Sequence, residues 1–395
     1  MKKNKISNRI IFISLTFLTF IFYWYGKEIA NYFDSKWILK YPKHYSVPFA
    51  IYTTSFVKWL INEASFGLFT FNDLTRFFAW IIEQPYNIVL AVLSKGILSG
   101  QGQDAIQLMR PLSWISVVGI FFTLALYTKD KFLILLVILS IIYLAVFDQW
   151  QSSMITLSSI IIAVPIGVLL GILLGIFSYK SKILEKIITP ILDLMQTVPV
   201  FAYLVPILVM FGFGPVSALI ATIIYAMPPM VRTTLLALNN LDPQLKESGI
   251  MSGCTDRQLM WKVLIPVSKP TLLIGVNQVI MLSLNMVIIA SMIGAGGLGY
   301  DVLASLRRLD IGGGIESGIA IVVIAIALDR LSQSFANLPT LSKKTEQTFF
   351  IKYKKIIFLV IYIIGIYILG SFISFFKLFP KELMINTSLF WEELV

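Results

Sequence analysis

The chain has 395 residues, of which 57% are hydrophobic and only 13% are charged. A soluble domain carries about 25% charged residues, so this composition excludes an ordinary soluble protein and predicts an integral membrane protein. The single Cys254 excludes a disulfide framework, the single His44 excludes a histidine-rich metal site, and the net charge of +11 is better explained by basic cytoplasmic loops than by nucleic-acid binding.

The N-terminal segment 1–26 is basic at first and then apolar from Ile10 to Tyr25. A signal peptide has the same order, but no A-x-A-like cleavage site follows, so we predict an uncleaved transmembrane span with its N-terminus inside. Segment 27–107 mixes polar and aromatic residues, and we interpret it as external, with amphipathic helices at the membrane interface. A small domain packed on the outer face is the alternative.

Further apolar runs predict two spans in 108–150, a core in 151–335, and a last part, 336–395, with a cytoplasmic linker, an additional span and an external tail. With the first span, the predicted spans number nine; the later eight cover roughly 112–128, 132–148, 153–177, 195–213, 215–232, 270–293, 315–333 and 356–376. Starting from an inside N-terminus, this order places most of the basic connections in the cytoplasm. We therefore expect an all-α polytopic membrane protein.

The cytoplasmic segment 233–269 is long for a connection between two spans, and its spaced apolar residues predict short amphipathic helices. We expect these helices to be broken at Gly249 and Gly253 and stopped by Pro266 and Pro270. An amphipathic helix held outside the membrane favours a partner with a groove. An ordinary structured loop is the alternative.

Polar residues occur within the predicted span 270–293. Asn277, Met281 and Asn285 share one helical face, and Gln278 lies beside it. Polar groups at this depth usually face a bundle interior or a water-filled path, so we predict that this face lines a pathway. Hydrogen bonding between helices is the alternative.

The glycines Gly294, Gly296 and Gly299 spell G-x-G-x-x-G, the fingerprint of a dinucleotide-binding turn. They follow a predicted span rather than a strand and fall on the outer face, so a sharp turn of the backbone explains them better. The chain has no G-x-x-x-x-G-K-[ST] motif and no Ser/His/Asp set. We therefore predict no enzyme activity, no cofactor and no metal site in this chain.

The cytoplasmic segment also resembles the E-A-A-x(3)-G-x(9)-I-x-L-P loop of ABC importer permeases. The matching positions are Glu247, Gly253, Val263, Ile265 and Pro266, and the chain departs from the pattern at Ser248 and Gly249, where the family usually has Ala. In that family this loop forms a coupling helix in a cleft of the ATPase subunit. Segments 190–214, 222–232, 275–303, 307–315 and 325–333 look like the permease of glycine betaine/proline betaine importers.

This resemblance implies a type I, MetI-like ABC permease bundle with extra N- and C-terminal spans, in the bacterial plasma (inner) membrane. It implies a separate cytoplasmic ATPase subunit, an external substrate-binding protein and a second permease copy in a homodimer, and glycine betaine, proline betaine or a related compatible solute as cargo. Arg307, Arg308 and Asp310 are expected on the outer face, where they either dock the binding protein or form a solvated turn.

A secondary transporter or channel without an ATPase is the alternative function. Such a protein is expected to carry Asp, Glu or Arg inside the membrane for ion coupling. The predicted span cores contain none.

Overall fold

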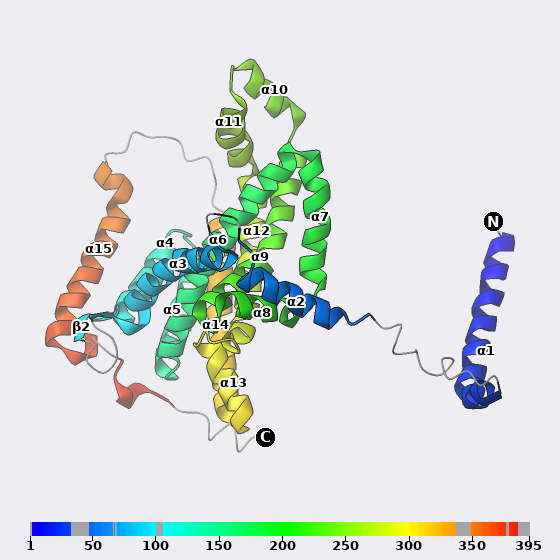
Figure 1. The fold of residues 1–395 in the computed structure, drawn as a ribbon. Coiled ribbons are helices and arrows are strands. Elements are labelled where there is room, and N and C mark those ends of the chain that lie inside the picture. Colours follow the sequence, from blue (N-terminus) through cyan, green and yellow to red (C-terminus); the bar gives the residue numbers. More distant parts are fainter. Residues whose placement is uncertain are drawn as a thin grey trace. The chain divides into compact units, whose positions relative to one another are not determined.

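The computed structural model describes residues 2–32, 47–65, 67, 69–99, 106–336, 349–376 and 379–385. The chain divides into two units, Met1–Phe71 and Asn72–Val395. The first unit contains α1 (Lys2–Tyr32) and α2 (Phe49–Asn62) (Figure 1). The predicted first span lies within α1, and the predicted linker and tail fall partly outside the described residues.

The described residues of the second unit are mainly helical and include one short hairpin, β1 (Ile97–Ser99) with β2 (Ile106–Met109), whose strands are antiparallel. Its helices are α3 (Phe71–Leu90), α4 (Trp114–Leu126), α5 (Lys131–Val146), α6 (Trp150–Lys180), α7 (Lys182–Thr197), α8 (Val200–Phe211), α9 (Pro215–Asn239), α10 (Pro243–Met251), α11 (Asp256–Gln258), α12 (Ile265–Ser291), α13 (Leu298–Arg308), α14 (Ile311–Ala336) and α15 (Phe349–Phe372). Two π-helical turns, Ala91–Lys95 and η5 (Leu259–Leu264), and two 3-10 turns, Ser374–Phe376 and Lys381–Leu383, complete it.

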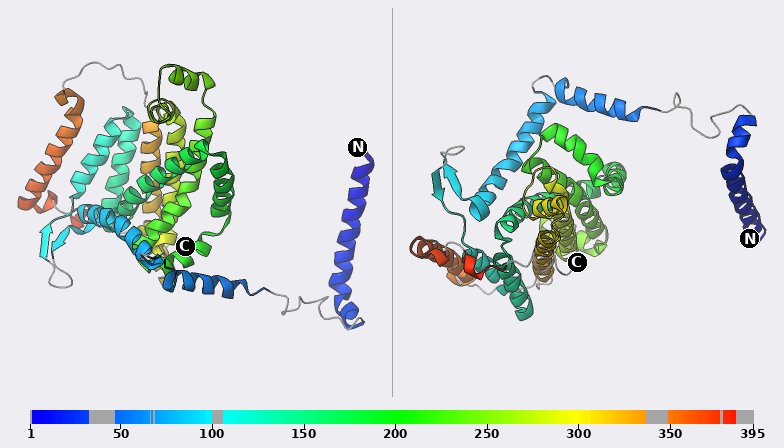
Figure 2. Two further views of the ribbon diagram at one scale, coloured as in Figure 1. Left: turned by 45° about the horizontal axis from the view of Figure 1, so that its top comes forward. Right: turned by 90° about the horizontal axis from the view of Figure 1, so that it is seen from below.

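Within the described residues, five helical stretches are long and apolar enough to cross a membrane: Phe71–Lys95, Trp150–Lys180, Pro215–Asn239, Asp256–Met286 and Ile311–Phe335. Shorter apolar helices cover Trp114–Leu126, Lys131–Val146 and Ile357–Gly370. The all-α membrane class is confirmed, whereas the count of nine spans stays a prediction. α1 is not among the five. α3 was expected at the interface but is among them, and Tyr86 and Leu90 of α3 pack in a cluster with Ile162 of α6 and Leu219 of α9. In Figure 2 the direction of α3 crosses that of α4 and α5.

The predicted span 195–213 begins at a sharp bend and stays a prediction. α7 and α8 meet there at a bend of 103°. Val198 is extended, with φ −68° and ψ 130°, because the ring of Pro199 excludes the preceding residue from the helical region and Pro199 has no N–H to donate. The chain therefore turns sharply where the apolar pattern continues.

The centre of the bundle is α6, α9 and α12, and glycines bring these helices close together. A Cβ atom added at Gly171 would lie 2.6 Å from the Cβ of Met230, and one at Gly175 would lie 2.5 Å from the Cβ of Thr234. The contacting positions advance in the same direction along both helices, from Gly171 to Gly175 on α6 and from Met230 to Thr234 on α9, so α6 and α9 run parallel. A Cβ at Gly275 of α12 would lie 2.7 Å from the sulfur of Met230. Small residues at such positions let membrane helices pack backbone to backbone.

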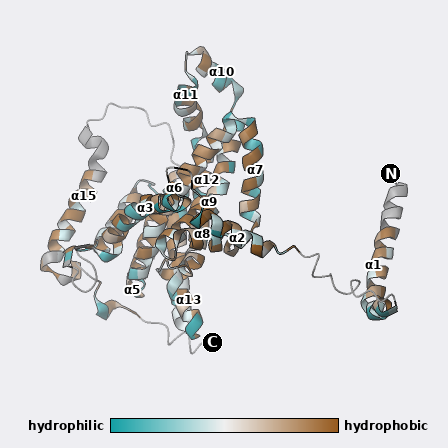
Figure 3. Ribbon diagram, in the orientation of Figure 1, coloured by the Kyte–Doolittle hydropathy of each residue, from teal (hydrophilic) through white to brown (hydrophobic). Residues whose placement is uncertain are grey.

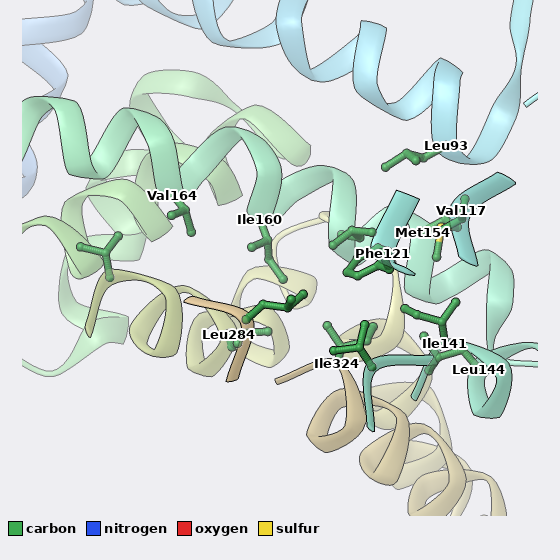
Figure 4. Packing of buried hydrophobic residues seen from close by; sticks show 14 of the residues in the cluster. Leu93, Val117, Phe121, Ile141, Leu144, Met154, Ile160, Val164, Leu284 and Ile324 are labelled. Carbon is green, nitrogen blue, oxygen red and sulfur yellow. The ribbon is translucent and has the colours of Figure 1, made fainter. Parts of the chain in front are cut away.

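A second layer of helices extends this centre. α14 packs on α12 and α5, α5 packs on α4, and α4 packs on α15. Figure 4 shows their apolar side chains filling the space between α4, α5, α6, α12 and α14, with Leu144, Met154 and Ile324 among them.

Polar contacts join α15 and the turn that follows it to α4 and to Arg110, which precedes α4. The guanidinium of Arg110 donates to the carbonyl oxygen of Gly370 at 2.6 Å, and Trp114 donates its indole N–H to the carbonyl oxygen of Phe375 at 3.1 Å. The hydroxyl of Tyr362 donates to the carbonyl oxygen of Ile115 at 3.1 Å. The predicted additional span is thus part of the second unit's packing.

The glycine-rich turn closes the end of the bundle opposite α10. Gly294, Gly296 and Gly297 have positive φ, and the N–H of Leu298 donates to the hydroxyl of Thr156 on α6 at 3.0 Å. Because the turn connects α12 to α13 and packs on α6, its role as a sharp backbone turn is confirmed. Figures 1 and 3 show hydrophilic residues gathered in α10 and in α13, at opposite ends, with mainly hydrophobic helices between them.

Candidate functional site

The predicted cytoplasmic segment folds into a helical hairpin that projects from one end of the bundle. α10 begins with the carboxylate of Asp242, which accepts the N–H of Gln244 at 2.9 Å, and with Pro243 in the first helical position. α10 ends at Met251; two residues later Gly253 has φ +76°, and the N–H of Cys254 donates to the carbonyl oxygen of Gly249 at 3.1 Å. The predicted break at Gly253 is confirmed, because glycine adopts this left-handed conformation at little cost.

The predicted break at Gly249 is wrong, because this residue lies inside α10. Gly249 is buried, and a Cβ atom there would lie 2.5 Å from Cδ1 of Leu259 in η5. Its small size therefore serves close packing between the two arms of the hairpin. Leu259, Met260 and Leu264 continue this packing in a cluster with Ile176 and Leu238 at the ends of α6 and α9.

Pro266 and Pro270 do not stop the second arm, contrary to the prediction. α11, η5 and α12 follow one another without interruption from Asp256 to Ser291. The π-helical turn η5 ends just before Pro266. A π-helical turn is wider than an α-helical turn, so it accommodates a proline, which cannot donate the i→i−4 hydrogen bond. The helix that contains the predicted span 270–293 therefore begins earlier, at Asp256.

The residues that match or replace positions of the E-A-A-x(3)-G-x(9)-I-x-L-P pattern differ in how far they are exposed. Gly249 is buried between its arms, and Val263 and Ile265 are half-buried. Glu247, Ser248, Gly253 and Pro266 are exposed. Ile250 and Met251 share the outer surface of α10, where the exposed fraction of Met251 reaches 89%. An exposed carboxylate beside exposed apolar side chains is a surface suited to a protein partner.

Glu247→Ala is expected to weaken binding of a partner to α10 while leaving the stability of the protein unchanged. Glu247 is the fifth residue of α10, beyond the first turn, so its interaction with the helix dipole is small and its exposed charge carries the effect. The loss of one exposed ion pair is worth about 0.2–1 kcal/mol. Co-purification of the partner that the sequence resemblance implies, a cytoplasmic ATPase subunit, at graded salt concentrations measures this change; equal retention of wild type and variant would contradict it.

The residues predicted to line a pathway do not all share one face. Gln278, Met281 and Asn285 are exposed on one side of α12, together with Ile274 and Ile288. Asn277 is half-buried, and its Oδ1 atom is buried with no hydrogen-bond partner. The exposed face of α12 thus carries two amide side chains in a helix apolar enough to cross a membrane. Pathway lining stays a prediction for these residues.

The outer residues lie at the tip of α13. Arg307 and Arg308 are exposed in its last turn, beside the exposed side chains of Leu306 and Leu309. The carboxylate of Asp310 instead accepts the N–H of Gly313 at 2.8 Å, near the start of α14. The two arginines are therefore available to a partner, whereas Asp310 has a structural contact that the sequence did not reveal.

The sequence missed a charge pair between α7 and α9. The guanidinium of Arg232 forms an ion pair with the carboxylate of Asp193. Arg232 had been placed at the end of its predicted span and Asp193 just outside another, but α9 continues to Asn239. Glu316 is also buried, in α14. These charges lie at or near the ends of the predicted spans, so the expectation that the span cores lack Asp, Glu and Arg stays a prediction.

No group of three or more His, Cys, Asp or Glu side chains that could hold a metal ion occurs among the described residues.

Three curated relatives share much of this sequence. The trimethylamine N-oxide transport system permease protein TmoV of Pelagibacter ubique is 40% identical over 81% of this chain and 46% of its own length. The glycine betaine/proline betaine transport system permease protein ProW of Salmonella typhimurium is 42% identical over 50% of this chain and 56% of its own. The glycine betaine transport system permease protein OpuAB of Bacillus subtilis is 39% identical over 62% of this chain and 84% of its own. The chain thus spans about half the length of the first two.

A family described as "Binding-protein-dependent transport system inner membrane component" matches residues 167–376, more than half of the chain. The match begins within α6 and ends after α15. The chain belongs to the family of binding-protein-dependent transport system inner membrane components.

Proposed function

We propose that this chain is the permease subunit of an ABC importer that moves glycine betaine, proline betaine or a related compatible solute, including trimethylamine N-oxide, into the cytoplasm. The observation that carries this proposal is the set of relatives named for transport of these solutes, which match up to 81% of the chain. Trimethylamine N-oxide and the betaines share a methylated, positively charged nitrogen and a negatively charged oxygen. The cargo is thus a small quaternary ammonium zwitterion or a close analogue.

The partners of this permease are a cytoplasmic ATPase subunit and an external substrate-binding protein. The ATPase binds the hairpin of α10 and η5, through the exposed surface that includes Glu247, Ile250 and Met251. The binding protein docks at the opposite end, on the tip of α13 with Arg307 and Arg308. A fixed hairpin between an ATPase and the ends of α6, α9 and α12 can transmit motion to the bundle, because packed helices move as rigid elements.

Two copies of the permease form a homodimer around the solute path. In support, the face of α12 with Gln278, Met281 and Asn285 is exposed in a single chain although it carries amide groups. Amides at membrane depth are unfavourable next to lipid and favour a protein or water neighbour.

The test is uptake of radiolabelled glycine betaine, proline betaine and trimethylamine N-oxide by proteoliposomes that contain the permease, its ATPase and its binding protein. We expect ATP-dependent uptake of at least one of these solutes, and none when any of the three proteins is omitted. Uptake by the permease alone, driven by an ion gradient, would instead favour a secondary transporter.

The purified permease alone is expected to show no ATP hydrolysis, because the sequence has no phosphate-binding G-x-x-x-x-G-K-[ST] loop. Release of inorganic phosphate is measured before and after addition of the ATPase subunit. Steady hydrolysis by a preparation free of partner proteins would contradict the assignment of ATP hydrolysis to a separate subunit.

A further inference from the structure

The ion pair of Asp193 and Arg232 joins α7, which precedes the sharp bend, to α9 in the centre of the bundle. Both side chains are only half-covered within one chain, with exposed fractions of 58% for Asp193 and 44% for Arg232. A pair this open is held weakly, because water competes for both charges. It can therefore separate without unfolding either helix.

Arg232 lies inside α9, and Asp193 lies four residues before the end of α7 at Thr197. Arg232 is seven residues before the end of α9 at Asn239, which corresponds to about 10 Å along the helix axis. Asp193 is eleven residues after Lys182, about 16 Å from the start of α7. Where such helices cross a membrane, their charged groups face a bundle interior or a water-filled path rather than lipid.

The sequence of α7 indicates which side of this helix faces water. One exposed side is apolar, with Ile183, Ile187, Ile191 and Leu194. Another exposed side is polar, with Thr189, Asp193, Gln196 and Thr197. In a membrane the first side suits lipid and the second does not. The charge pair thus lies on the polar side of an amphipathic helix.

We propose that Asp193 and Arg232 form a transient binding site for the zwitterionic solute on its way through the membrane. The guanidinium of Arg232 binds the negatively charged oxygen of the solute, and the carboxylate of Asp193 attracts its quaternary ammonium group. The proposal rests on the proposed function for the class of solute. It assigns within this chain a site that recognises both charges of that solute.

When a solute replaces the contact between Asp193 and Arg232, electrostatics favour a zwitterion over a simple ion. In the empty site the two side chains neutralise each other. A zwitterion inserted between them replaces each partner with an equivalent charge, so the net charge of the site stays zero throughout. A cation or an anion alone would pair with one side chain and leave the charge of the other without a partner.

The experiment compares Asp193→Asn and Arg232→Gln with wild type in the complete assembly of permease, ATPase and binding protein in proteoliposomes. We expect the maximal rate of glycine betaine uptake to fall by about tenfold or more, which is the effect of losing a charge-assisted contact. Affinity of the binding protein for the solute and co-purification of the ATPase should not change. Lys186→Gln is the matched control, because it removes an exposed charge from the same helix at a position two turns from Asp193.

A second measurement separates solute binding from a purely structural ion pair. The permease alone, in lipid nanodiscs, is heated with equal concentrations of glycine betaine, tetramethylammonium chloride or sodium acetate. We expect the unfolding temperature of wild type and Lys186→Gln to rise more with glycine betaine than that of Asp193→Asn and Arg232→Gln, and no such difference with either single ion. A structural pair would lower the unfolding temperature of the two variants equally with every additive, and that outcome would overturn the proposal.

Arg232→Lys decides the question if the neutral variants do not accumulate in the membrane. Lysine keeps the charge and the pair but loses the planar, two-pronged contact with a carboxylate. Normal abundance with reduced uptake is expected, and normal uptake would overturn the proposal. If wild type itself takes up none of the zwitterions, the proposed function fails; if wild type and variants take them up equally, only the site proposed here fails.

Discussion

Gly249→Val is expected to abolish solute uptake while the permease remains in the membrane at normal abundance. A Cβ atom at this position would lie 2.5 Å from Cδ1 of Leu259, and Cγ2 of Val263 lies 3.9 Å away. One methyl group can be accommodated by rotation of the flexible Leu259 side chain, but the two further methyl groups of valine cannot. They would push α10 away from η5 and change the surface that α10 offers to the ATPase.

Gly249→Ala is the matched variant for this experiment, and we expect it to transport normally. The measurements are uptake of radiolabelled solute, co-purification of the ATPase and quantitative immunoblotting of membranes. If Gly249→Val transports like wild type, or fails only because the protein disappears from the membrane, the hairpin does not couple ATP hydrolysis to transport.

Gly253→Val is expected to uncouple transport from ATP hydrolysis. The cause is strain in the backbone at this position rather than a clash of the new side chain with its neighbours. Gly253 has φ +76°, and no atom lies within 4 Å of a Cβ placed there. A residue other than glycine costs about 1–2 kcal/mol in this conformation, and a β-branched residue costs more than alanine or asparagine. Gly253→Asn should therefore retain most of the uptake. Gly296→Ala, in the turn at the opposite end, should leave ATPase association unchanged in the same assay.

Gly171→Val is expected to give the largest loss of folded protein of any substitution considered for this chain. The atom that a new Cβ would meet is the Cβ of Met230, 2.6 Å away, with the carbonyl oxygen of Met227 at 3.4 Å. A Cβ atom is fixed to the backbone, so relief requires α6 and α9 to separate. Overpacking of this kind costs about 1–3 kcal/mol in soluble cores, and here it also exposes packed faces along two long helices.

Membrane abundance and the unfolding temperature in detergent measure this effect. Gly318→Val in α14 is the control, because no atom lies within 4 Å of a Cβ at that position. We expect the control to accumulate and unfold like wild type. An unchanged unfolding temperature for Gly171→Val would mean that α6 and α9 are not packed as closely as described.

The sequence by itself determined the membrane class, the helical content and the position of the hairpin. Composition was sufficient to predict the membrane class, because so few charged residues cannot cover the surface of a soluble domain. Long apolar runs predicted helices, since only a helix satisfies every backbone hydrogen bond within one segment in lipid. The spacing from Glu247 to Pro266 located the hairpin, and glycine at 253 predicted the end of α10 because glycine alone favours that backbone conformation.

Only the tertiary structure decided what depends on neighbours distant in sequence. Gly249 was interpreted as a helix break, but its packing on Leu259 shows why a small residue stands there. Pro266 was interpreted as a helix end, but the π-helical turn before it lets the helix continue. Asp193 and Arg232 lie 39 residues apart and form a pair only because α7 folds back along α9. Local pattern fixes which segments become helices, whereas contacts between helices decide which side chains meet and which charges are neutralised.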